Sequence, residues 1–142
     1  MGILRTTLAN DLGELKRINA AVLEFLAEEG VPPKVLNRVR LVIEELVVNI
    51  ITHAYDDASA HTIVLTVRTG PAQVSVTTED DGVAFDPRDA TPSSVGRPIE
   101  ELGGGGYGIH IIKHMAHVLE YERIDGRNRV RAVIEYAAGR AR

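Results

Sequence analysis

LVIEELVVNIITHAY, residues 41–55, decides the fold, because as a helix it is apolar almost all the way round and must be largely buried. Glu45 and Asn49 are four positions apart in it, so they lie on one face, one turn apart. Burying even a neutral polar group without a partner costs roughly 2–7 kcal/mol. A carboxylate that orients a hydroxyl, one turn from an amide oxygen that binds a hard cation, suits phosphoryl transfer. The alternative is a helix edge with two polar side chains.

The segments around this stretch show alternating signals for helices and strands. The long helix begins after Pro32-Pro33 and extends to about residue 54. In order, we expect a strand at 3–8, a helix from 12 to 30, the long helix, strands at 62–68 and 73–77, an aperiodic loop at 80–106, a helix from 109 to 116, and strands at 118–124 and 130–136. This order predicts an α/β two-layer sandwich with a mostly antiparallel sheet, in a single domain spanning 1–142.

Composition narrows the function classes. The chain has 142 residues, a net charge of −4 and a pI near 5.7, so neither nucleic acid nor an anionic membrane is an expected partner. It has no cysteine, which excludes disulfides and thiolate metal sites. The N-terminus lacks a signal-peptide pattern, and no apolar run reaches the roughly 18 residues of a membrane helix. We therefore expect a soluble, cytoplasmic domain.

Two further motifs follow the helix. Asp80-Asp81-Gly82 comes directly after a strand; the carboxylate can accept a hydrogen bond from an exocyclic amine, and the glycine lets a flat ring approach. A plain Asp-Gly turn is the alternative. The second motif, residues 102–109, reads LGGGGYGI and opens a helix, whose free N–H groups attract phosphate. A flexible hinge is the alternative there. Neither motif is a P-loop or a Rossmann fingerprint.

The three motifs in this order resemble the N, G1 and G2 boxes of the GHKL ATPases, which share the Bergerat ATP-binding fold. Within that superfamily the chain is most similar to the stand-alone anti-sigma factor serine/threonine kinases. The segments that carry the resemblance are EELVVNIITHAY, EDDGVAFDP, RPIEELGGGGYGIHIIKHM and YERIDGRNRV. The resemblance extends from about Leu4 to Tyr136 and implies a mostly antiparallel sheet with about three helices on one face.

The resemblance also implies a role for each motif residue. Glu45 would be the general base or hydroxyl-orienting carboxylate, and Asn49 the Mg²⁺ ligand of bound ATP. Asp80 would receive the adenine amino group, and Gly82 would let the ring approach. The phosphate loop would consist of Gly104, Gly105, Gly106 and Gly108. The family commonly has two acidic residues after the methionine that follows this loop, where this chain has Ala116 and His117 after Met115.

Partners follow from the same resemblance. The expected substrate is a serine or threonine on a STAS-domain anti-sigma factor antagonist, and the same kinase sequesters a sigma factor, so that partner switching regulates transcription. A homodimer is expected. One alternative is an ATP-binding anti-sigma or adaptor module without phosphotransfer activity. Another is the catalytic domain of a histidine kinase or another GHKL ATPase, although no dimerisation helix with a phosphoacceptor histidine is found.

Overall fold

The structure, a computed structural model, describes residues 1–55, 60–89 and 112–137 of the chain. Short 3₁₀ turns at Leu12–Glu14 and Pro87–Asp89 accompany the main elements, and residues 112–115 form a helical turn before β4. The main elements are β1 (Ile3–Ala9), α1 (Leu15–Glu28), α2 (Pro33–Asn49), β2 (Thr62–Gly70), β3 (Gln73–Asp80), β4 (Val118–Ile124) and β5 (Arg127–Glu135).

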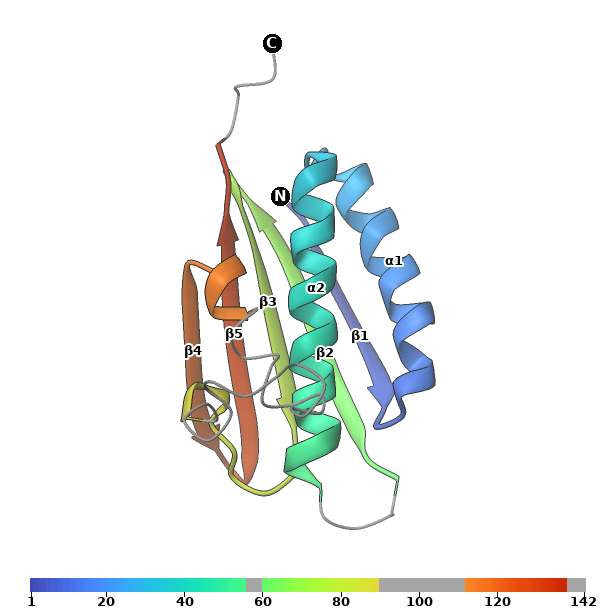
Figure 1. The fold of residues 1–142 in the computed structure, drawn as a ribbon. Helices are drawn as coiled ribbons and strands as arrows, with labels where there is room; N and C mark the ends of the chain where they lie inside the picture. The colour runs from blue at the N-terminus through green and yellow to red at the C-terminus, as the bar shows by residue number, and fades with distance from the viewer. Residues whose placement is uncertain (56–59, 90–111, 138–142) are drawn as a thin grey trace, which may run out of the picture.

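The strands form one sheet in the order β1-β2-β3-β5-β4, and every pairing in it is antiparallel. Helices α1 and α2 cover one face of this sheet, and the helical turn at 112–115 lies on the same side, over β4 and β5 (Figure 1). The predicted two-layer α/β sandwich of the Bergerat type is therefore confirmed. The first strand, β1, lies at one edge of the sheet, as its short β-branched run suggested.

Helix α2 is the central element of the core. It lies beside α1 on the same face of the sheet (Figure 1), and its apolar side chains Val39, Ile43 and Val47 are fully buried. The helix-facing side chains of the strands, such as Leu65 on β2 and Val76 on β3, are also fully buried. Contact with both α1 and the sheet explains why residues 41–55 carry few polar residues, although Thr52 and His53 are exposed. No helix in the described ranges is long and apolar enough to cross a bilayer.

Two strand bounds differ from the prediction by three residues, and the others by at most two. Strand β3 continues past Thr77 to Asp80, because its polar last residues pair with the first residues of β5. Strand β5 begins at Arg127 rather than Val130. The turn residues Asp125 and Gly126 both have positive φ, 52° and 75°, as a two-residue type I′ hairpin requires, so pairing resumes immediately after them.

The end of α2 has an unusual geometry. Its last turn, Ile50–Ala54, is π-helical, and Tyr55 then leaves it in an extended conformation. A π-helical turn widens the helix and often marks a functional site. Here it directs the Ala54 carbonyl toward the loop after β3, where it accepts a hydrogen bond from the Val83 N–H at 2.7 Å. The predicted helix to residue 54 is thus present, with a different final turn.

Candidate functional site

A small cavity lies where the C-terminal part of α2 meets the ends of β3 and β5. It brings together two of the residues predicted for the site, Asn49 and Asp80, while Glu45 lies one turn earlier on α2. The four predicted glycines of the phosphate loop lie outside the described residues. The cavity is lined by side chains from α2, β3, β5 and the segment after β3: Leu46, Asn49, Ile50, Thr78, Asp80, Phe85, Pro87 and Val130.

Asn49 is buried without partners. Only 3% of the residue is exposed, yet neither its Oδ1 nor its Nδ2 has a hydrogen-bond partner among the described residues. A buried polar group left unpaired costs about 1–3 kcal/mol, so it needs an explanation. A ligand that enters the cavity would supply it: the amide oxygen is a hard donor of the kind that binds Mg²⁺, which usually takes one or two protein ligands and completes its shell with phosphates and water. The predicted role of Asn49 fits this donor.

Asp80 is held at the floor of the cavity by two hydrogen bonds to a single oxygen. Its Oδ1 accepts from the Gly82 N–H and from Nδ2 of Asn128, both at 2.9 Å. Burial raises the pKa of Asp80, and these two hydrogen bonds offset part of the increase. Within the described residues Oδ2 accepts no hydrogen bond, so it is the oxygen available to a donor in the cavity.

Asn128 organises the loop after β3, and we did not predict it. It is 2% exposed and lies opposite Asp80 in the β3–β5 pairing. Its Nδ2 also donates to the Val83 carbonyl at 2.8 Å. Its Oδ1 accepts from Phe85 N, Tyr121 OH and Arg123, at 3.2, 2.7 and 3.0 Å. Asparagine is depleted in strands, so an asparagine directly after a hairpin turn is the signal that could have identified it.

Gly82 packs against the end of α2. A Cβ built on Gly82 would overlap the Ala54 carbonyl oxygen and lie 2.6 Å from the Ala54 Cβ, a separation that folded proteins do not tolerate. Arg123 donates to the Gly82 carbonyl at 2.8 Å on the other side. The structure therefore gives this glycine a packing reason that the sequence did not suggest. Its predicted role beside the nucleobase stays a prediction.

The two neighbouring carboxylates on α2 have different environments. Glu44 accepts from Nδ2 of Asn19 at 3.1 Å and from Arg40 at 2.8 Å, which fixes it against α1. Glu45 forms no hydrogen bond or ion pair within the described part of the chain. Burial, and then the charge of Glu44, raise the pKa of Glu45. A carboxylate with a raised pKa and no structural partner has the properties of a proton acceptor.

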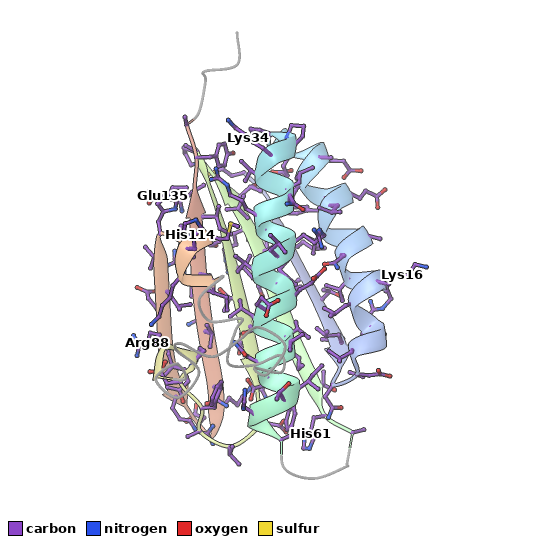
Figure 2. All side chains as sticks on the ribbon, viewed as in Figure 1. Lys16, Lys34, His61, Arg88, His114 and Glu135 are labelled. Atoms are coloured by element: carbon purple, nitrogen blue, oxygen red, sulfur yellow. The ribbon has the colours of Figure 1, made fainter. Side chains whose placement is uncertain are left out.

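Aromatic rings support the loop around Asp80. His53 stacks on Phe85 with ring centroids 4.9 Å apart, and Tyr55 stacks on His61 at 4.0 Å. Asp81, the exposed neighbour of Asp80, contacts Tyr55 OH and His61 Nδ1, both at 3.3 Å. Figure 2 shows His61 at the end of the molecule where α2 ends. The two adjacent aspartates thus have different surroundings. Asp80 faces the cavity, whereas Asp81 connects the loop to Tyr55, which follows the π-helical turn, and to His61.

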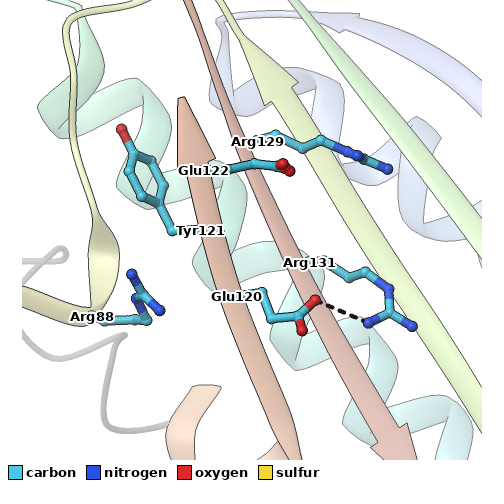
Figure 3. Close-up of a pocket in the computed structure, with 6 residues that line it drawn as sticks. All are labelled: Arg88, Glu120, Tyr121, Glu122, Arg129 and Arg131. Carbon is cyan, nitrogen blue, oxygen red and sulfur yellow. Dashed lines mark hydrogen bonds and ion pairs between the residues drawn. The ribbon is translucent and has the colours of Figure 1, made fainter. Parts of the chain in front are cut away.

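A larger groove on β4 contains none of the predicted residues. Its lining residues lie on both sides of this edge strand: in Figure 3, Tyr121 and Arg88 are on one side, and the acidic side chains Glu120 and Glu122 are on the other. Arg131 pairs with Glu120 at 3.1 Å. The groove is therefore an open surface that extends around an edge strand and holds none of the predicted residues, and the cavity beneath α2 is the better candidate site.

Comparisons with known proteins agree with this geometry. The serine/threonine-protein kinase BtrW of Bordetella bronchiseptica is 34% identical over 88 residues, which make up 62% of this chain and 62% of that protein. The blue-light activated histidine kinase of Erythrobacter litoralis EL346 superposes with a TM-score of 0.53 at 21% identity, covering 78% of this chain and 33% of that one. Its histidine kinase domain gives 0.53 at 20% identity, covering 87% and 60%.

The chain spans less than two thirds of the length of each of these relatives, and at about 20% identity the structural likeness shows the fold alone. The sequence also matches the histidine kinase-like ATPase domain family over residues 8–134, which includes all of α2, the cavity and the β4–β5 hairpin. The chain therefore belongs to the histidine kinase-like ATPase domain family, in the GHKL superfamily of ATP-binding proteins.

Proposed function

We propose that the chain is an ATP- and Mg²⁺-dependent serine/threonine-protein kinase of the anti-sigma factor type. The family supports an ATP site, and the name of the Bordetella relative supports a serine or threonine as the acceptor. One observation carries the proposal. Glu45, whose pKa burial raises, lies one helical turn from the unpaired amide of Asn49, which lines the same cavity as Asp80.

The nucleotide would be held by three sets of groups. Oδ2 of Asp80 accepts from the adenine amino group, and Gly82 lies beside the ring. Oδ1 of Asn49 is the protein ligand of Mg²⁺, which when bound offsets the negative charge of the phosphates. The phosphates would be bound by the glycine motif of Gly104, Gly105, Gly106 and Gly108, which lies outside the described residues.

Glu45 would act on the acceptor hydroxyl. A carboxylate whose pKa is raised is a stronger base than an exposed one, so it can orient the serine or threonine hydroxyl and accept its proton as the phosphoryl group is transferred. Glu44 does not compete for this role, because its hydrogen bonds with Asn19 and Arg40 hold it toward α1.

The partners in this proposal are a STAS-domain anti-sigma factor antagonist, as phosphoryl acceptor, and a sigma factor that the same kinase sequesters. The protein would act in the cytoplasm as a homodimer. These statements rest on the motifs and on the relative. An ATP-binding anti-sigma or adaptor module that transfers no phosphate is the competing function, and the test below separates the two.

The first measurement is Mg-ATP binding by calorimetry, on the wild type and on Asp80→Asn. Asn at position 80 can still accept from Gly82 and Asn128 through its oxygen, but it then presents an N–H to the adenine amine. We expect binding by the wild type and at least a tenfold loss in the variant, since two donors cannot pair. A wild type that does not bind Mg-ATP refutes the proposal.

The second measurement is transfer of labelled γ-phosphate to a panel of STAS-domain proteins. We expect Glu45→Gln to bind Mg-ATP normally and to lose transfer. The matched control, Glu44→Gln, changes the neighbouring carboxylate in the same way and should retain transfer. Wild-type binding without transfer to any serine or threonine would identify the module without kinase activity. Full transfer by Glu45→Gln would exclude the role given to this residue.

A further inference from the structure

The cavity contains a second buried polar group without a partner, the hydroxyl of Thr78. Thr78 is fully buried, with 0% of the residue exposed, and its Oγ1 forms no hydrogen bond. It lies on β3 two residues before Asp80. Since side chains alternate between the faces of a strand, both point to the helix-covered side, and both line the cavity with Asn49.

Packing does not explain the hydroxyl. The preceding helix-facing residues of β3 are Val74 and Val76, and the residue paired with Thr78 on β5 is Val130. A valine would fill the space of Thr78 without leaving a polar atom unpaired. The strand cannot easily satisfy the hydroxyl either, because β3 is paired on both sides, with β2 and with β5, and its backbone groups are already used in the two ladders.

We propose that Thr78 is a second nucleobase-recognition residue, whose hydroxyl donates to the ring nitrogen next to the amino group of adenine, directly or through one water. This inference rests on the proposed ATP site. Adenine presents a donor, its amino group, beside an acceptor, the ring nitrogen N1. Asp80 offers an acceptor and Thr78 a donor in the same cavity, which is the complementary pair.

Of this pair, Asp80 discriminates against guanine, because a carboxylate can only accept hydrogen bonds whereas the Thr78 hydroxyl can both donate and accept. On the corresponding edge guanine carries a carbonyl oxygen where adenine has the amine, and a ring N–H where adenine has the acceptor. The Asp80 carboxylate would then face an oxygen, and both partners would be acceptors. Sites built to hydrogen-bond one pattern reject the reverse pattern strongly, since they leave buried polar groups unpaired.

The experiment is a double-mutant cycle between the protein and the ligand. We would measure by calorimetry the binding of Mg-ATP and of 1-deaza-ATP, which has C–H in place of N1, to the full chain and to Thr78→Val. Wild type should bind ATP about three- to tenfold more tightly than 1-deaza-ATP, as one hydrogen bond predicts. Thr78→Val should lose the same factor for ATP and discriminate little between the two ligands. Thr78→Ser, which keeps the hydroxyl, should restore discrimination.

Thermal unfolding without nucleotide is the folding control. Because Thr78→Val removes an unpaired buried hydroxyl, its Tm should equal or exceed that of the wild type. Thr78→Val that binds ATP as tightly as the wild type, or that still discriminates fully against 1-deaza-ATP, overturns this inference and leaves the proposed function intact; the hydroxyl would then serve a structural water. A wild type that binds neither nucleotide overturns both.

Discussion

Asn128→Asp tests whether the carboxamide of Asn128 holds Asp80 in place. The substitution keeps the shape of the side chain and its acceptor oxygen, so the bonds from Phe85, Tyr121 and Arg123 can persist. It replaces the Nδ2 donor, which lies 2.9 Å from Asp80 Oδ1 and 2.8 Å from the Val83 carbonyl, with an oxygen. The new carboxylate oxygen would then face two other acceptors, Asp80 Oδ1 and the Val83 carbonyl oxygen, and both hydrogen bonds would be lost.

The size of the effect follows from those two bonds. A hydrogen bond to a charged group contributes about 1.5–3 kcal/mol, and one to a backbone carbonyl about 1 kcal/mol. At pH 8 we therefore expect a loss of about 2.5–4 kcal/mol in the free energy of unfolding. Two carboxyl groups this close share one proton, so the folded-state pKa of the pair lies above the value of about 3.9 for an unfolded aspartate. The stability from that proton is present at low pH and lost as pH rises through the folded-state pKa.

Urea denaturation at pH 5 and pH 8, followed by far-ultraviolet circular dichroism because the chain has no tryptophan, measures both effects. The deficit of Asn128→Asp should shrink at pH 5, where the shared proton replaces the lost donor. Asn37→Asp is the matched control: Asn37 is exposed on α2 and uses only its oxygen, which accepts from Arg40, so its stability should change by about 0.5 kcal/mol or less. Equal deficits at both pH values would refute this account of the Asp80 site.

Three further predictions concern stability. Gly82→Ala should lower the free energy of unfolding by about 1–3 kcal/mol, because the new methyl overlaps Ala54; in the same chemical melt Gly70→Ala, whose nearest contact would be Gln73 Cγ at 3.5 Å, should lose clearly less. Leu46→Ala should cost about 2–5 kcal/mol, since Leu46 is 2% exposed, and a smaller loss would mean that the cavity wall collapses. Glu45→Gln should stabilise the nucleotide-free protein increasingly as pH rises above about 4.5, because the raised pKa of Glu45 means that ionisation disfavours the folded state. An unchanged pH profile of Tm would contradict the desolvation of Glu45.

Local patterns predicted the fold well because the fold depends on local signals. Three local patterns each specify an element to within a few residues. They are the alternation of apolar and polar residues in β2, the Asp-Gly turn before β5, and the apolar residues around most of the circumference of α2. The bounds of β3 were harder to predict. Its last residues, Thr78 to Asp80, are all polar. The alternation of apolar and polar residues therefore stops at the point where the strand reaches the cavity. Only their pairing with β5 shows that they belong to the sheet.

Two of the residues that line the cavity were singled out from the sequence, for a related physical reason. Asn49 and Asp80 could be chosen from the sequence, because a polar residue inside an apolar helix or at a strand end stands out locally. Asn128 is 48 residues from Asp80 in sequence, and its importance depends on the register of two strands. The unpaired state of Thr78 likewise depends on what surrounds it in three dimensions. The π-helical turn at Ile50–Ala54 has no sequence signature that we could read.

The carboxamide of Asn128 links the cavity at Asp80, where we propose that the nucleobase binds, to the β4–β5 hairpin. The side chain of Asn128 contacts Asp80, the backbone of Phe85 and Tyr121 on β4. A ligand that forms a hydrogen bond with Asp80 would therefore also change the stability of the hairpin. Coupling of this kind is reciprocal: whatever factor a nucleotide applies to the affinity of a protein bound at the hairpin, that protein applies to the affinity of the nucleotide. A coupling of about 1.4 kcal/mol, the size of one good hydrogen bond, would make that factor about tenfold in both directions.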